Sequence, residues 1–230
     1  MSVLYLYALV GDPPRGDMGR GLRRERLEIL QGRGFHVVVG RMDSVPLAAP
    51  ATLRRHDAAV RRIAAQVDAI LPIRFGSVVP DEDAVARLLA PRALELAGRL
   101  VHVRGHEQMT LRIFGPRRAS KPRAPVVGRA TGARLGRGAR YLAERKRFHD
   151  TAAAPELDPI RPLLDGLVTD ERVQRHATPP LLASVYHLVP HGRQAQYRMR
   201  LARAAGQLAP LRLTVSGPWQ PYAFGADTWP

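Results

Sequence analysis

The feature that most constrains the fold is an uncharged run of aromatic and aliphatic side chains close to the N-terminus. Residues 3–10 alternate the two kinds of side chain, which is typical of a buried β-strand. Residues 35–39 are rich in β-branched side chains and predict a second strand. No apolar run approaches the roughly 20 residues that a membrane helix requires. We therefore expect a sheet with a sizeable core and no membrane span.

Helical spacing after Thr52 predicts an amphipathic helix that packs on this sheet. Thr52 has a side-chain oxygen that can accept from the first free backbone amides, so it is a candidate N-cap. Arginines occupy most of the opposite face. The apolar face carries His56, Val60, Ile63 and Val67.

Shorter segments give further predictions in the first half of the chain. Residues 22–30 predict a short helix, and Pro72 places the strand around it at a sheet edge. Asp81 is a candidate N-cap for the next helix, which Pro91 should kink or split. Residues 100–114 predict an extended segment that folds as a hairpin around its glycine.

Composition changes after residue 114 and indicates a domain boundary. Residues 115–137 are rich in glycine, proline and arginine and predict a linker between residues 1–114 and 138–230. The second half predicts a mixture of helices and strands without strict alternation. We therefore expect the α+β class, with two small domains that each mix helices and strands. The predicted elements beyond residue 160 are a helical piece near 163–167, strands at 181–189 and 211–216, and a helix at 192–208.

The net charge of +16 leaves two interpretations open. Such a chain attracts nucleic acid, anionic lipid or acidic protein. Nearly all of the basic residues are arginines, which favours ordinary surface charge over a dedicated partner. The basic linker carries no aromatic side chain before Tyr141, whereas stacking grooves for single strands combine both kinds of residue. A nucleic-acid-binding module is the alternative function, and we expect any such binding to be nonspecific.

The chain carries no recognisable signature of an active site. It has no cysteine, no Gly-x-Ser-x-Gly elbow and no phosphate-binding loop. In an extended segment His102 and His106 stand roughly 13 Å apart, too far to share one metal ion. His187 and His191 meet the same difficulty. We therefore predict a protein without catalysis, cofactor or metal.

Three segments together resemble the GvpL/GvpF family of gas vesicle proteins. They are residues 71–82, residues 138–146 and the tail 217–224, and they occur in the expected order over nearly the whole chain. The tail departs from the family pattern at Gln220 and Ala223. The positions that carry the resemblance are Leu71, Pro72, Arg74, Phe75, Gly76, Asp81, Tyr141, Leu142, Gly217, Pro218, Trp219, Pro221, Tyr222 and Phe224.

The resemblance implies both a fold and a function. It implies an N-terminal α+β domain, a C-terminal ferredoxin-like domain and a role in gas vesicle assembly. Its implied partners are the small hydrophobic shell protein and other accessory proteins, at the gas vesicle in the cytoplasm. It implies no cofactor and no catalysis.

Structural roles account for most of these positions. We expect Arg74 to pair with Asp81 or Glu82 and so to fix a turn. We expect Tyr141 and Leu142 to contact the core from a helix. The strands at 71–76 and 211–216 are candidate edges for pairing with the shell protein. The aromatic residues expected to pin the tail on its own C-terminal domain are Trp219, Tyr222 and Phe224.

Overall fold

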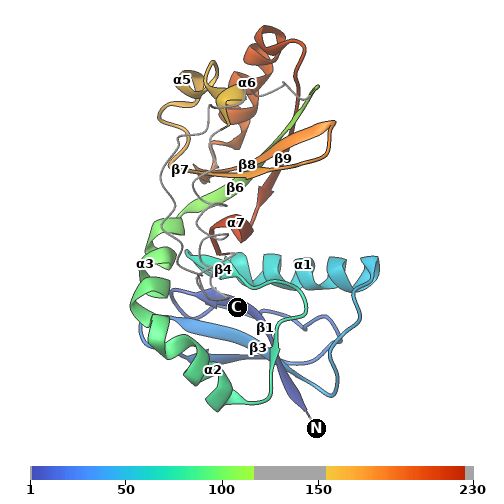
Figure 1. The fold of residues 1–230 in the computed structure, drawn as a ribbon. Helices are drawn as coiled ribbons and strands as arrows, with labels where there is room; N and C mark the ends of the chain where they lie inside the picture. The colour runs from blue at the N-terminus through green and yellow to red at the C-terminus, as the bar shows by residue number, and fades with distance from the viewer. Residues whose placement is uncertain (1, 117–153, 226–230) are drawn as a thin grey trace, which may run out of the picture. The chain divides into compact units, whose positions relative to one another are not determined.

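The chain divides into two compact units (Figure 1). The computed structural model describes residues 2–116 and 154–225. The first unit holds Met1–Met109, Leu188–Gln194 and Gly217–Pro230, and the second holds Thr110–His187 and Ala195–Ser216. This division differs from the expected ranges 1–114 and 138–230, because residues 188–194 and the tail belong to the first unit and residues 110–114 belong to the second. Residues 117–137 of the expected linker lie outside the described residues.

The first unit is built on an antiparallel sheet of five strands. The strands follow the spatial order β2-β3-β1-β4, and β5 also pairs with β1. β1 is the predicted first strand, and every residue from Leu4 to Val10 is at most 1% exposed. The strands are β1 (Val3–Val10), β2 (Leu27–Gln31), β3 (His36–Met42), β4 (Ile70–Pro72) and β5 (Val78–Val79).

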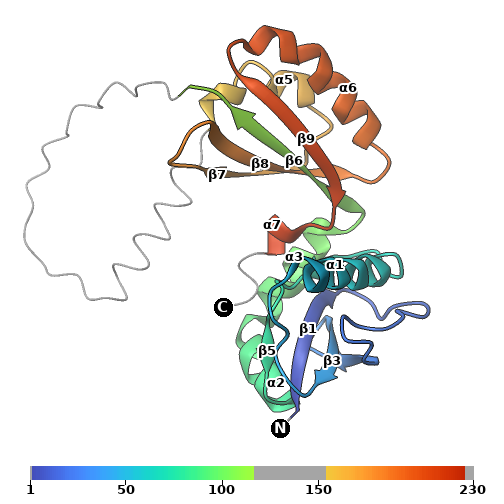
Figure 2. The same ribbon diagram turned by 90° about the vertical axis from the view of Figure 1, so that its right-hand side faces the viewer.

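Helices cover both faces of this sheet (Figure 2). One face packs against α1 (Pro50–Ala64), which buries His56, Val60 and Ile63 as its spacing predicts. The other carries α2 (Glu82–Leu89) and α3 (Ala93–Val103), and a single 3-10 turn at Ala90–Arg92 separates them. Pro91 lies in that turn, so the predicted break is confirmed.

Three local predictions in the first unit are wrong. Residues 22–30 do not form a helix, because Leu27 begins strand β2 and pairs with β3. The N-cap of α1 is Ala49 and not Thr52. Thr52 Oγ1 instead accepts from the Ala49 amide at 3.0 Å. Residues 100–103 continue α3, and the turn at Gly105 joins this helix to a strand.

The second unit holds most of a four-stranded sheet with the spatial order β7-β8-β6-β9. Helices α5 (Arg161–Leu164) and α6 (Gln194–Ala205) lie together on one face of it (Figure 2). The crossover from β6 to β7 includes residues outside the described part, so the ferredoxin-like assignment stays a prediction. The strands are β6 (His106–Phe114), β7 (Asp170–Arg175), β8 (Leu181–Pro190) and β9 (Arg212–Trp219).

A bulge in β1 keeps one face of that strand directed at α1. The register against β3 shifts between Leu6 and Ala8, which inserts one residue and reverses the alternation. As a result Tyr5 before the bulge, the inserted Tyr7, and Ala8 and Val10 after it all join one core cluster with α1.

The two tyrosine hydroxyls in this core are hydrogen-bonded to two loops that are distant from each other in sequence. The Gly76 amide donates to Tyr5 Oη at 3.1 Å, and Tyr5 Oη lies 2.9 Å from His56 Nδ1. The Leu22 amide donates to Tyr7 Oη at 2.8 Å, and the Tyr7 hydroxyl donates to the Glu25 carboxylate. Burial raises the pKa of both tyrosines, so each remains a hydroxyl.

The buried imidazole of His56 makes the stability of this unit depend on pH. Burial lowers the pKa of His56 from 6.5 to about 4, so the folded chain holds it neutral. Between these values the unfolded chain binds more protons, so the free energy of unfolding should rise with pH, and up to about 3 kcal/mol should be lost as the pH is lowered from 7.5. Urea unfolding between pH 5 and 7.5 measures this slope. It should flatten in His56→Phe and persist in a variant of the exposed His102, His102→Gln; an equal slope in all three proteins would contradict the assignment.

Candidate interaction surfaces

The first recognised segment, residues 71–82, forms the edge strand β4 and the turn that follows it. Leu71 and Pro72 are buried in β4, which lies at the end of the sheet as Pro72 predicts. Gly76 has a φ of 89°, which only glycine adopts without strain, and its amide donates to Tyr5. Asp81 Oδ1 accepts from the Ala84 amide at 2.7 Å, so the predicted N-cap of α2 is confirmed.

The tail returns to this same segment. Beyond β9 it forms the short helix α7 (Tyr222–Gly225), which packs against β4 and α3. Gln108 Oε1 accepts from the Ala223 amide at 2.8 Å and holds the start of this helix. A Cβ on Gly225 would stand 3.3 Å from the Pro72 carbonyl oxygen, so the backbones approach closely. Two recognised segments that are distant in sequence therefore form one structure.

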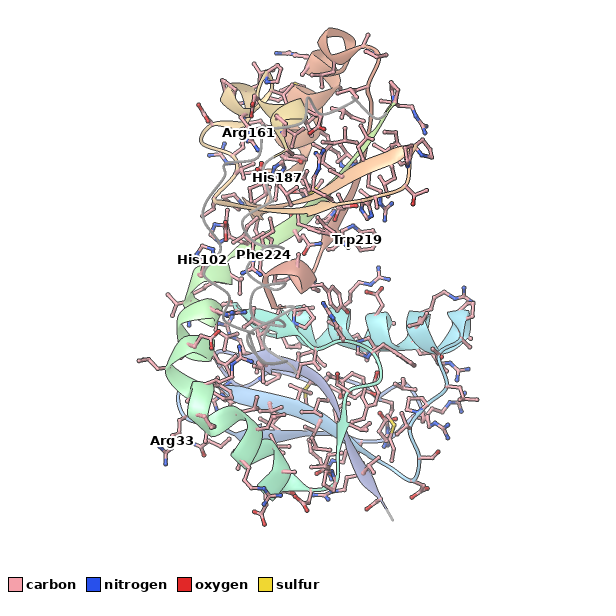
Figure 3. All side chains as sticks on the ribbon, in the orientation of Figure 1. Arg33, His102, Arg161, His187, Trp219 and Phe224 are labelled. Carbon is pink, nitrogen blue, oxygen red and sulfur yellow. The ribbon has the colours of Figure 1, made fainter. Side chains whose placement is uncertain are left out.

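This arrangement corrects the expected role of the tail aromatics. They do not pin the tail on a C-terminal domain, because α7 belongs to the first unit. Phe224, labelled in Figure 3, is buried, and Tyr222 packs against the cluster that holds Tyr5 and Tyr7. Pro221 is also buried, whereas Trp219 keeps 39% of its surface exposed. Pro218 follows Gly217, whose φ of 115° brings it close to the backbone of Gln108.

Arg74 does not form the expected ion pair. Asp81 caps α2 and lies 3.9 Å from Arg87, and Glu82 pairs with Arg41. Within the described residues the exposed Arg74 guanidinium has no hydrogen-bond or ion-pair partner. Phe75, beside it, is half-buried against His56, so the backbone is fixed while the arginine faces solvent. Tyr141 and Leu142 of the middle segment lie outside the described residues.

Three of the histidines considered as metal ligands, His102, His106 and His191, lie in a helix or contact neighbouring protein groups. His102 lies in the last turn of α3, and His106 Nδ1 lies 2.7 Å from the Arg104 carbonyl oxygen. His191 Nδ1 lies 3.3 Å from a Glu107 carboxylate oxygen. No group of three or more potential metal ligands occurs among residues 2–116 and 154–225.

A partly buried polar network links four elements of the second unit, and Figure 3 labels two of its members, Arg161 and His187. His187 Nε2 donates to Glu171 at 2.9 Å, and His187 Nδ1 lies 2.7 Å from Tyr197 Oη. Arg161 donates to the other Glu171 oxygen at 2.8 Å. The hydrogen bond from His187 is the main reason that the pKa of Glu171 falls to about 2. The network ties β7, β8, α5 and α6 together, which sequence spacing alone did not reveal.

Helix α3 presents an apolar stripe to solvent. Leu94 is 90% exposed and Val101 is 67% exposed, and they lie two helical turns apart on one face. Gly98 stands between them with no neighbouring atom, so the face is flat at its centre. We call Leu94, Gly98 and Val101 the α3 stripe. The expectation of an extended segment at residues 100–114 concealed it, because the stripe requires a helix through Val101.

Comparison with known proteins identifies the family. The sequence profile of the family described as "Gas vesicle synthesis protein GvpL/GvpF" matches residues 3–226. The chain belongs to the GvpL/GvpF family of gas vesicle proteins. A search among curated proteins finds no match.

Two solved GvpF structures share the fold. GvpF from Microcystis aeruginosa superposes with a TM-score of 0.71 at 19% identity, over 97% of this chain and 98% of that one. GvpF from Anabaena sp. PCC7120 superposes with a TM-score of 0.69 at 18% identity, over 98% and 96%. These similarities establish the mixed α and β fold over both units of this GvpL/GvpF member. None of its described helices is long and apolar enough to cross a bilayer.

The packing of α7 on β4 predicts a clear ranking of tail variants. Phe224→Ala removes a buried ring and should lower the free energy of unfolding by about 3–5 kcal/mol. Trp219→Ala, in the same tail but partly exposed, should cost about 1 kcal/mol. Urea titration with m-values compares the two. Equal costs, or a smaller cost for Phe224→Ala, would show that the tail is not held as described.

Proposed function

We propose that this chain takes part in gas vesicle assembly, without catalysis, by binding the small hydrophobic shell protein and other accessory proteins. The observation that carries the proposal is the family match over residues 3–226. The α3 stripe supports it, because an exposed apolar helix face fits a partner with apolar surface of its own. On this proposal the chain acts at the gas vesicle in the cytoplasm.

The physical problem is aggregation of the shell protein before assembly. A shell that excludes water needs subunits with an extensive apolar face, and such a face associates nonspecifically until it is covered. A helix with apolar side chains two turns apart can cover part of such a face. In the α3 stripe the two large side chains flank Gly98, which lets a partner approach the helix backbone closely.

The two candidate strand edges differ in their availability. β4 lies at a sheet edge, but all of its residues are buried and α7 packs against it, so it is not open to another strand. β9 is the last strand in the order β7-β8-β6-β9, and within the described residues its outer edge has no neighbouring strand. We therefore keep β9 as the candidate edge and place the main apolar contact at the α3 stripe.

Co-expression with the shell protein tests the stripe. Leu94→Glu/Val101→Glu places two charges on exposed positions, so the chain should fold, yet the soluble yield of shell protein should fall at least about fivefold. The matched control is Met199→Glu, an apolar residue of α6 that is 47% exposed and lies in the other unit.

Co-purification separates the outcomes. The wild-type chain and the control should retain the shell protein on an affinity column, and the stripe variant should not. A soluble yield of shell protein that none of the three chains changes would reject the proposal that this chain keeps the shell protein soluble before assembly. Equal losses with the stripe and control variants would reject the stripe as the contact.

A further inference from the structure

A cavity lined by arginines opens in the first unit, apart from the α3 stripe. Its volume is about 630 Å³. Arg23 and Arg24 reach it from the turn before β2, Arg41 from β3, and Arg55 from the first half of α1. Four arginines from three separate parts of the chain therefore surround one space.

The charge in this cavity is only partly neutralised within the unit. Arg41 is committed elsewhere, because it pairs with Glu28 at 3.2 Å and also with Glu82. Asp43 lines the cavity as well and reduces its positive charge. Of the four cavity arginines, Arg23, Arg24 and Arg55 have guanidinium groups without a hydrogen-bond or ion-pair partner in the part of the chain that the structure describes.

Hydrogen bonds within the turn and to the core fix the turn that carries Arg23 and Arg24. The Gly21 amide donates to the Glu25 carbonyl at 2.9 Å, and the Arg24 amide donates to the Gly21 carbonyl at 3.1 Å. The Glu25 carboxylate accepts from the Arg23 amide at 2.8 Å and from the buried Tyr7 hydroxyl. Glu25 is thus engaged by the turn itself, and the arginines are held before any ligand arrives.

Arg24 occupies a backbone conformation that favours glycine. Its φ is 68°, and among the described residues it is the only non-glycine with a positive φ. A bulky side chain in the left-handed region is strained, and such strain concentrates at functional positions. Glycine would adopt this conformation without strain. The chain nevertheless has arginine here, which points to a use for the arginine side chain.

Exposed apolar side chains lie close in sequence to two of the lining residues, Asp43 and Thr52. The loop between β3 and α1 exposes Val45 and Leu47, and α1 exposes Leu53. Thr52, which lines the cavity, donates to the Leu47 carbonyl at 2.7 Å, so the backbone of this apolar loop contacts the cavity lining. The surface therefore offers positive charge in the cavity and apolar side chains on segments that also line it.

We propose that this cavity binds a segment of a partner protein in which carboxylates alternate with apolar side chains. Arginines bind carboxylates with two parallel hydrogen bonds, and the exposed leucines and valine of these segments cover the apolar positions. A nucleic acid fits less well, because no aromatic side chain lines the cavity to stack on a base. The inference depends on the proposed function only in taking the partner to be a protein.

Fluorescence anisotropy with the full chain tests the site. The probe is a labelled synthetic peptide of repeated Glu-Leu-Glu-Glu-Leu units, compared with the same peptide carrying glutamine for glutamate and with an oligodeoxythymidine. The glutamate peptide should bind with an affinity that falls as salt rises. The glutamine peptide should bind at least ~10-fold more weakly, because it cannot form the charged hydrogen bonds.

Three variants localise the binding. Arg24→Gly should keep or raise the thermal midpoint yet weaken the glutamate peptide at least ~10-fold, a combination that a purely structural role for the arginine does not give. Arg55→Gln, in α1, should weaken it similarly. Arg33→Gln/Arg203→Gln removes exposed arginines outside the cavity and should leave the affinity within about twofold.

The contrary results are equally definite. Binding that is unchanged in Arg24→Gly and Arg55→Gln would overturn the site, and so would equal binding of the glutamine peptide. Tighter binding of the oligodeoxythymidine that is lost in the same variants would assign the cavity to nucleic acid instead. None of these results depends on the α3 stripe, so this site and the proposed function fail separately.

Discussion

The first unit depends on the need to satisfy two tyrosine hydroxyls inside its core. β1 is buried along its length, so the hydroxyls of Tyr5 and Tyr7 cannot reach solvent. A buried hydroxyl without a partner costs about 1–3 kcal/mol. Each hydroxyl therefore fixes a backbone amide of a loop, at Gly76 for Tyr5 and at Leu22 for Tyr7. The central strand thus sets the positions of two loops that are distant from each other in sequence.

Those loops carry exposed arginines at Arg23, Arg24 and Arg74. The Tyr5 side supports residues 71–76, where the tail docks through α7 and where Arg74 faces solvent without a partner in the described part. The Tyr7 side supports the turn that holds Arg23 and Arg24 over the arginine-lined cavity. A buried core with charged loops fits the proposal that this GvpL/GvpF member presents surfaces to other proteins.

The local sequence pattern correctly predicted those elements that are determined by their own residues and not by pairing with distant segments. The strand at residues 3–10, the buried face of α1 and the break at Pro91 follow from alternation, helical spacing and the missing proline amide. The helix predicted at residues 22–30 was wrong, because the leucine spacing fits either a helix or a strand and only pairing with β3 decides between them. The docking of the tail and the arginine cavity depend on contacts between distant residues, which spacing along the chain does not encode.

Amide hydrogen exchange in two single-hydroxyl variants tests the central claim most directly. Tyr7→Phe and Tyr5→Phe keep the buried rings and remove one hydroxyl each. The account predicts faster exchange at the Leu22 amide in Tyr7→Phe with Gly76 unchanged, and the reverse in Tyr5→Phe. Unchanged protection at both amides, or equal loss at both in either variant, would contradict the claim that each hydroxyl holds its own loop.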